Sequence, residues 1–145
     1  MWLNNNSISS NALWYGVSFS GSATTGTRTG NLTMHKTLPV QSQFRGCTVA
    51  SDGAVKYLNA TDWTVYEDGT ARDTTLNTMV EIPAFAIKFI VTSNTVEIRM
   101  SPYLLDGYYH FKKQYVSAYE AYNSGGVLKS IKGVTPTVST SREQF

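Results

Sequence analysis

The chain has 145 residues, of which 41% are hydrophobic and only 15% charged, and its formal net charge is +2. This length fits one domain of ordinary size, and the hydrophobic content argues against a disordered chain. Its 12 basic residues form no run of the kind that nucleic-acid-binding surfaces use, so we expect no nucleic-acid partner.

The N-terminal residues 1–12 are polar and rich in Asn and Ser, which predicts a connecting or flexible segment. They lack the basic and apolar regions of a signal peptide. No stretch of the chain approaches the length of a membrane span, so we expect no membrane insertion. Residues 13–145 are predicted to form a single β-rich domain that is incomplete at its C-terminus.

Strands and turns dominate the first part of this domain. Residues 20–30, which contain three glycines, are expected to be a loop, and residues 35–43, interrupted by Pro39, an irregular segment or short helical turn. The sequence Ser51-Asp52-Gly53-Ala54 is typical of a hairpin turn. Strands are predicted at residues 13–19, 44–49 and 54–58.

The second part contains the clearest strand signals. Residues 79–91 are dense in apolar and β-branched side chains and predict a strand that is broken near Pro83. In residues 95–100, Val96, Ile98 and Met100 alternate with Glu97 and Arg99, which is typical of a half-buried strand. A further strand is expected at residues 115–120, closed by a turn at residues 124–126 against residues 127–130.

Cysteine and histidine usage gives no sign of a metal site or a cofactor. The single cysteine, Cys47, lies in a context that favours a buried strand. The two histidines, His35 and His110, lack metal-ligand spacing. Asp-Gly pairs at 52–53, 68–69 and 106–107 match ordinary turn chemistry better than a calcium loop.

No motif indicates a catalytic centre. The sequence has no nucleophile elbow, no zinc-protease motif and no phosphate-binding loop ahead of a helix. Acidic residues are present without any spacing that would pair two of them for catalysis. We therefore predict no catalytic residues and a protein that is not an enzyme.

Aromatic side chains in or beside loops are the best candidates for contacting a ligand. Tyrosine and tryptophan combine rigid contact area with a polar group, as recognition surfaces require. Core packing is the alternative role for each of them. The predicted ligand-binding residues are Trp63, Tyr66, Tyr108 and Tyr109.

The last residues carry the signature of a helix N-terminus. Thr140 or Ser141 is followed three residues later by Glu143 or Gln144, which is a capping box. Because no helix follows in this sequence, we expect the chain to be the front part of a longer protein.

Five parts of the sequence carry a resemblance through their order along the chain: residues 35–47, 52–53 with 55–58, 79–83, 115–121 and 133–145. In this order they resemble phage- and prophage-encoded tail-fibre or receptor-binding proteins of Bacteroides-type gut bacteria. The stretch after Ile82-Pro83 departs from that pattern, because residues 84–88 are more apolar than the basic and aromatic stretch of the family.

The resemblance implies a C-type-lectin-like α+β fold, related to formylglycine-generating-type domains, of which this chain would be the mainly β N-terminal part with an antiparallel sheet and hairpins. In that family the C-terminal portion makes the ligand contacts, so no binding residue is transferred to this sequence. The implied location is the virion, an extracellular particle whose proteins are made in the bacterial host cytoplasm. The implied partners are other virion proteins, further copies of the chain in a homo-oligomer such as a trimer, and a host cell-surface glycan or protein.

Three functions remain open. The first is a non-enzymatic virion fibre or adhesion protein that supports host-receptor recognition. The second is a purely structural head or tail attachment or decoration protein. The third is a truncated enzyme domain of the formylglycine-generating type.

Overall fold

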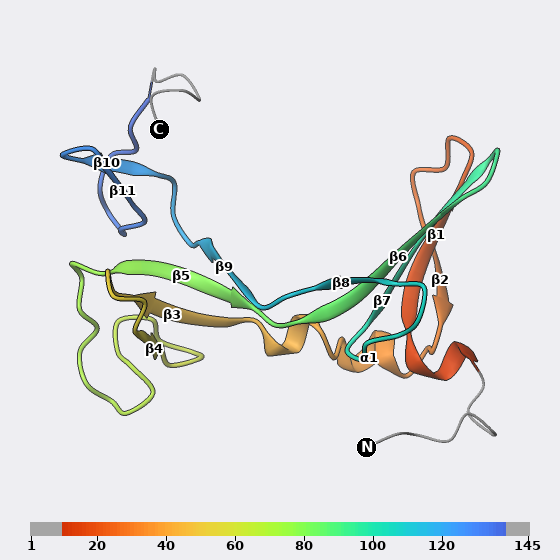
Figure 1. Cartoon of the computed structure of the whole chain (residues 1–145), viewed down its shortest axis with the longest axis horizontal. Helices are drawn as coiled ribbons and strands as arrows, with labels where there is room; N and C mark the ends of the chain where they lie inside the picture. The colour runs from red at the N-terminus through yellow and green to blue at the C-terminus, as the bar shows by residue number, and fades with distance from the viewer. Residues whose placement is uncertain (1–9, 139–145) are drawn as a thin grey trace. The chain divides into compact units, whose positions relative to one another are not determined.

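A computed structural model of the chain describes residues 10–138 (Figure 1). Strands hold 43% of the described residues and helices 8%, which confirms the mainly β class with antiparallel sheets and hairpins. The C-type-lectin-like assignment stays a prediction. The helix N-terminus expected at Thr140 or Ser141 lies outside the described residues.

The described residues form two compact units, each made of two separate stretches of chain. Unit 1 consists of residues 10–43 and 83–113, and unit 2 consists of residues 44–82 and 114–138. The predicted domain at residues 13–145 stays a prediction. Among residues 10–138, no helix is both long and apolar enough to cross a membrane.

Unit 1 is built on a five-stranded antiparallel sheet with the strand order β2-β1-β7-β6-β8 (Figure 1). The hairpin of β6 and β7 confirms the strands predicted on either side of residues 93–94. The elements of unit 1 are the 3-10 helices η1 (Ser10–Leu13) and η2 (Gln41–Gln43), the α-helix α1 (Met34–Thr37), and strands β1 (Tyr15–Ser20), β2 (Thr27–Gly30), β6 (Phe85–Val91), β7 (Thr95–Ser101) and β8 (Tyr109–Phe111).

The expectation that residues 20–30 are entirely loop was wrong, because β2 pairs with β1 over Thr27–Gly30. Glycine and threonine in this segment do not form the alternating pattern that predicts a strand. The segment becomes a strand because its backbone pairs with the free edge of β1. Gly30 has φ 75, and a Cβ there would lie 2.6 Å from the ring of Trp14. This close approach of two chain segments requires glycine.

Unit 2 contains a four-stranded antiparallel sheet with the order β4-β3-β5-β9 and a separate hairpin of β10 and β11. The turn predicted at residues 124–126 is confirmed, but it joins β10 to β11, while the strand predicted at 115–120 is the shorter β9 and pairs with β5. The strands of unit 2 are β3 (Arg45–Val49), β4 (Val55–Tyr57), β5 (Asn77–Ile82), β9 (Gln114–Ser117), β10 (Tyr122–Ser124) and β11 (Val127–Lys129).

The break predicted near Pro83 is confirmed, and it divides two sheets. Strand β5 ends at Ile82 and pairs with β3 in unit 2, whereas β6 begins at Phe85 and pairs with β7 in unit 1. Because proline has no N–H to donate, it cannot continue the ladder of a central strand.

Residues 59–76 form a loop in unit 2 that is fixed by four turns of one kind. In each turn the side-chain oxygen of an Asn or Asp accepts hydrogen bonds of 2.5–3.0 Å from the backbone N–H and the hydroxyl of the Thr two residues later. The four pairs are Asn59 and Thr61, Asp62 and Thr64, Asp68 and Thr70, and Asp73 and Thr75.

Cys47 is fully buried in β3, as its sequence context predicted. Its Sγ lies 3.7 Å from the backbone oxygen of Met79 on the neighbouring strand β5. Cys47 therefore contributes to the interior of unit 2.

Candidate interaction surface

The structure places the four predicted ligand-binding aromatic residues in two different units. Trp63 and Tyr66 belong to unit 2, and Tyr108 and Tyr109 belong to unit 1. The four side chains differ in how much of their surface is exposed.

Tyr66 exposes only 5% of its surface. Its hydroxyl lies 3.1 Å from the Thr48 hydroxyl and accepts a hydrogen bond of 3.1 Å from the backbone N–H of Asp73. The Lys56 ammonium lies 4.0 Å from the ring centroid. Tyr66 thus packs loop 59–76 against the sheet and has too little free surface to form part of a recognition surface.

Trp63 is half-buried beside a hollow of about 140 Å³. A Cβ on Gly46 would lie 2.6 Å from the indole, so the glycine allows the ring to lie directly on strand β3. Arg45 and Glu67 line the hollow and form an exposed ion pair of 2.5 Å. The hollow has room for a small polar group beside the indole.

Tyr108 and Tyr109 are neighbours in sequence with different surroundings. Tyr108 is half-buried beside Arg99 and 5.6 Å from the Lys88 ammonium, and this burial raises the pKa of its hydroxyl. Tyr109 is 67% exposed, and its ring contacts that of Phe111 edge to face. Of the four predicted residues, Tyr109 therefore has the largest exposed fraction.

Tyr109 stands on a continuous apolar face of the unit 1 sheet. Residues that are paired directly across neighbouring strands point to the same side of a sheet, as do residues two apart within a strand. The pairings align Tyr109 with Ile87 and Met100, and Phe89 with Ile98 and Val17. We call this the apolar face; it consists of Tyr15, Val17, Phe19, Phe85, Ile87, Phe89, Val91, Val96, Ile98, Met100, Tyr109 and Phe111.

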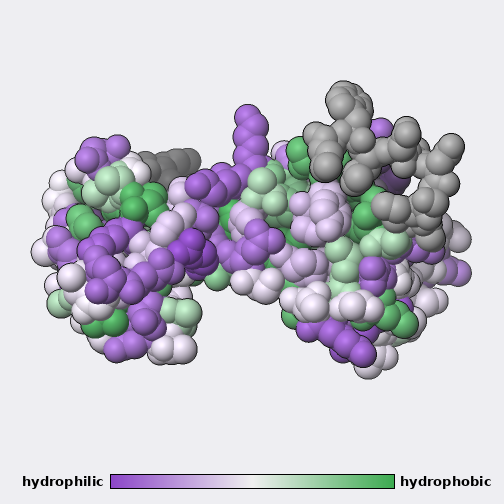
Figure 2. Space-filling model, turned by 90° about the horizontal axis from the view of Figure 1, so that it is seen from below, coloured by the Kyte–Doolittle hydropathy of each residue, from purple (hydrophilic) through white to green (hydrophobic). Residues whose placement is uncertain are grey.

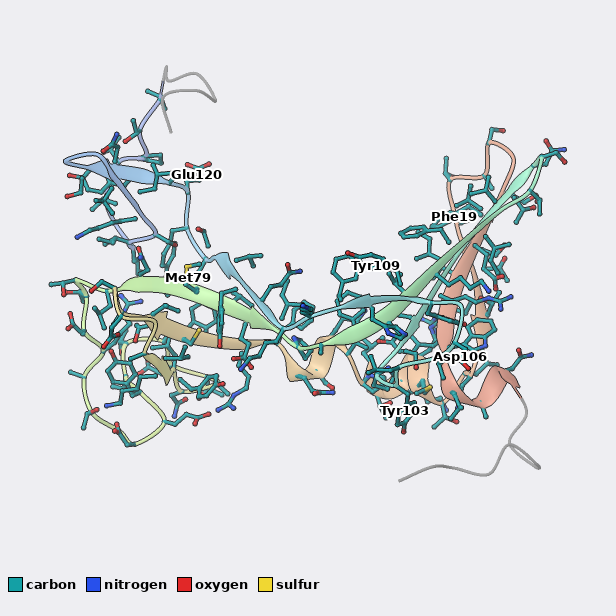
Figure 3. All side chains as sticks on the ribbon, viewed as in Figure 1. Phe19, Met79, Tyr103, Asp106, Tyr109 and Glu120 are labelled. Atoms are coloured by element: carbon teal, nitrogen blue, oxygen red, sulfur yellow. The ribbon has the colours of Figure 1, made fainter. Side chains whose placement is uncertain are left out.

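Figure 3 shows the side chains of Phe19 and Tyr109 on one side of the unit 1 ribbon and those of Tyr103 and Asp106 on the other. Hydrophobic residues also reach the surface singly among hydrophilic ones, as Figure 2 shows for the side that it draws. Scattered residues of that kind are normal on a protein surface. The apolar face differs because its members adjoin one another across four strands.

Toward the end of the β6 and β7 hairpin, burial is the reverse of what the sequence alternation suggests. Val96 on the apolar face exposes 39% of its surface, whereas the side chain of Glu97 on the opposite face exposes 15%. Phe89 and Val91 expose 60% and 71%. The apolar side of β6 and β7 thus faces outward toward the end of the hairpin, where an ordinary sheet would be polar.

The opposite face is covered near Arg99 and Ser101 by the residues just before β1. Arg99 donates hydrogen bonds of 3.0 and 2.8 Å to Glu97, and its guanidinium stacks 4.1 Å from the ring of the buried Trp14. The hydroxyl of the buried Ser101 donates to the backbone oxygen of Leu13 over 2.7 Å. The hydrogen bonds from Arg99 lower the pKa of the Glu97 carboxyl.

One end of the apolar face is covered by the segment that contains α1 and η2. Tyr15 is buried, its hydroxyl donates to Gln41 over 2.6 Å, and it accepts a bond of 3.2 Å from the N–H of Val40. The His35 ring meets the Tyr15 ring edge to face at 5.6 Å. Burial raises the pKa of the Tyr15 hydroxyl.

A hollow of about 270 Å³ opens where this cover meets the uncovered part of the face. Leu38 at its rim has φ 45 and ψ 60, a left-handed conformation that is costly for leucine. The hydrogen bond of 2.7 Å from Leu38 N–H to Met34 O holds this backbone in place. The hollow is lined by Tyr15, Gly16, Val17, Phe19, His35, Leu38, Gln41, Ile98 and Met100.

This arrangement suits contact with an apolar surface. No group of three or more His, Cys, Asp or Glu side chains is placed to hold a metal ion within residues 10–138. Large exposed apolar patches mark sites where proteins bind one another. The apolar face is therefore the candidate functional site, and Tyr109 is the predicted residue that belongs to it.

The sequence pattern predicted part of the apolar face. The alternation of Val96, Ile98 and Met100 with Glu97 and Arg99 correctly gave the two faces of β7. It did not show which face is covered, because that depends on contacts between residues far apart in the chain, such as Ser101 with Leu13 and Arg99 with Trp14.

No family model, no curated protein and no solved structure matches this chain.

Proposed function

We propose that this chain is a non-enzymatic virion fibre or adhesion protein whose unit 1 docks to protein partners and so supports host-receptor recognition. The observation that carries the proposal is the outward-facing apolar face around Phe89, Val91 and Tyr109. A surface of this kind is unfavourable in water and becomes stable when a partner covers it.

The virion setting rests on the resemblance of the ordered motifs to tail-fibre and receptor-binding proteins. Fibre proteins work as parts of an assembly, which agrees with a unit that leaves half of one sheet face for a partner. The low charge of the chain also suits packing between subunits. Within this proposal, unit 1 provides attachment, and host contact belongs to other parts of the assembly.

A purely structural attachment or decoration protein is the second candidate, and the placement of the aromatic residues favours it. Tyr66 is buried and Trp63 is half-buried beside a small hollow, so the two predicted aromatic residues of unit 2 offer little surface for a receptor. The formylglycine-generating-type enzyme is less well supported, because a reactive thiol needs access to its surroundings and Cys47 is fully buried.

The proposal is tested with an antibody raised against the purified protein and particles purified from cells that produce it. Gold-labelled antibody is expected to bind at a tail or fibre in electron micrographs, and excess antibody is expected to block adsorption of the particles to host cells. Labelling without any effect on adsorption would favour the purely structural candidate. Particles that carry no label would rule out both virion roles.

A further inference from the structure

We infer that the apolar face of unit 1 binds the same face of a second copy of this chain. This inference deepens the proposed docking function by naming the partner, and it rests on that function. Three properties of the face point to a copy of the chain.

The first property is charge. Strands β1, β6, β7 and β8 bring only Val, Ile, Met, Phe and Tyr side chains to the apolar face. The charged strand residue on this side of the sheet is Arg28 of the edge strand β2, which pairs with Val17. A charged face repels its own copy, because the same sign is presented from both sides. Because Arg28 lies at the edge, the four apolar strands can meet their own copy without this penalty.

The second property is area. Phe89, Val91 and Tyr109 expose 60%, 71% and 67% of their surfaces, and Phe19 and Val96 expose 37% and 39%. These five residues alone present roughly 500 Å² to solvent, which is the larger part of the about 800 Å² that each partner buries in a standard stable interface. This area lies in the upper part of the range of about 300–600 Å² found for the largest exposed patch of a typical monomer.

The third property is shape. A two-fold interface uses one patch twice, so the patch must carry both a projection and a recess to receive it. The apolar face carries exposed rings at Phe89 and Tyr109 and, beside them, the hollow under Leu38. This hollow of about 270 Å³ exceeds the roughly 150 Å³ that suffices to take up a benzene molecule.

Sedimentation equilibrium of the full chain, over concentrations from micromolar to about 100 µM, tests this inference. We expect the wild-type chain to associate and the variant Phe89→Glu to raise the dissociation constant at least 100-fold. Tyr109→Glu, on a different strand of the same face, is the second variant and should act in the same direction.

Leu104→Glu is the matched control, because Leu104 is 67% exposed in unit 1 but lies outside the apolar face. It introduces the same charge and should leave the dissociation constant within threefold of wild type. Circular dichroism and the fluorescence of Trp14, which is buried in unit 1, verify that each variant is folded.

A wild-type chain that stays monomeric at about 100 µM would overturn the inference and show that a different protein covers the face. Association that persists equally in both face variants and the control would overturn it too. Neither result affects the gold-labelling experiment, so failure of this inference and failure of the proposed function can be told apart.

Discussion

The sheets of the two units are covered in different ways. In unit 2, loop 59–76 packs on one face through Tyr66, and on the other face the Glu81 carboxylate accepts hydrogen bonds of 2.8 and 2.9 Å from the hydroxyls of Tyr57 and Tyr115. In unit 1, the covered face is the polar one, and half of the apolar face is open. Unit 2 thus covers both faces of its sheet with contacts of its own, whereas unit 1 leaves part of its apolar face exposed.

The largest expected effect is the difference in stability between a substitution at the covered end of the apolar face and one at its exposed end. Phe85 is buried and stacks on Phe111, with 4.9 Å between ring centroids, whereas Phe89 on the same strand and face is exposed. Phe85→Ala should lower the free energy of unfolding by about 3–4 kcal/mol, because it leaves a cavity. Phe89→Ala should cost less than about 1 kcal/mol in the monomer.

Urea unfolding followed by fluorescence measures both changes. Equal losses from the two alanine substitutions would mean that the whole apolar face is covered within the monomer.

The next comparison places the same substitution in each unit. A Cβ on Gly16 would lie 2.4 Å from the backbone oxygen of Ile98, whereas a Cβ on Gly46 would meet the side chain of Trp63. Gly16→Val should cost about 3 kcal/mol, because the pairing of β1 with β7 must shift. Gly46→Val should cost less, since an indole at the surface can move aside.

Thermal unfolding of the two valine variants gives the order of their melting temperatures. A lower melting temperature for Gly46→Val than for Gly16→Val would contradict this view and indicate that Trp63 is held rigidly.

A smaller effect is expected from the polar network of unit 2. Glu81→Leu removes the acceptor that Tyr57 and Tyr115 share, and the loss of buried hydrogen bonds should cost about 2 kcal/mol. Glu67→Gln is the control, because it removes an exposed ion pair with Arg45 and should cost less than about 1 kcal/mol. Chemical denaturation distinguishes the two variants. An unchanged free energy of unfolding in Glu81→Leu would show that polar contacts do not stabilise this face.

The smallest effect concerns the turns of loop 59–76. The hydrogen bond from the Thr70 hydroxyl, followed by the one from Lys56, lowers the pKa of the Asp68 carboxyl well below its usual range. Because the folded-state pKa is lowered, the stability linked to this carboxylate is present above its ordinary pKa of about 4 and is lost as the pH falls through the lowered value.

Thr70→Val should raise the pKa of Asp68 toward its ordinary value, as an NMR pH titration of the carboxyl carbon would show. Thr74→Val is the control, because Thr74 is the middle residue of the neighbouring Asp73 turn, whose hydrogen bonds come from Thr75. An unchanged pKa of Asp68 in Thr70→Val would mean that the threonine hydroxyl does not bind the carboxylate in solution.

Local patterns in the sequence predicted much of the fold. The β6 and β7 hairpin, the break at Pro83 and the buried Cys47 all depend on residues close together in the chain, and all are confirmed. Strand β2 was missed because its pairing with β1 is decided by tertiary contact.

The candidate site was predictable only in part, for a related reason. Tyr109 was identified as a residue with recognition potential, but the neighbours that make it part of a surface come from β6 and β7. In β6, Lys88 is the sole charged residue within an apolar run, so the sequence pattern does not separate an inner from an outer face. In the sequence Tyr66 could not be distinguished from Tyr109, because its contacts with Thr48 and Asp73, which place it in the interior, form only in the folded chain.

The repeated Asx and Thr turns bear on the order of events during folding. Each turn joins residues two apart, so forming it closes almost no loop and costs little chain entropy. Loop 59–76 joins β4 to β5. It can therefore take its shape within the time of local chain motion, before β5 pairs with β3. We expect this preformed loop to bring the two strands together, so that the longest connection inside unit 2 speeds its folding.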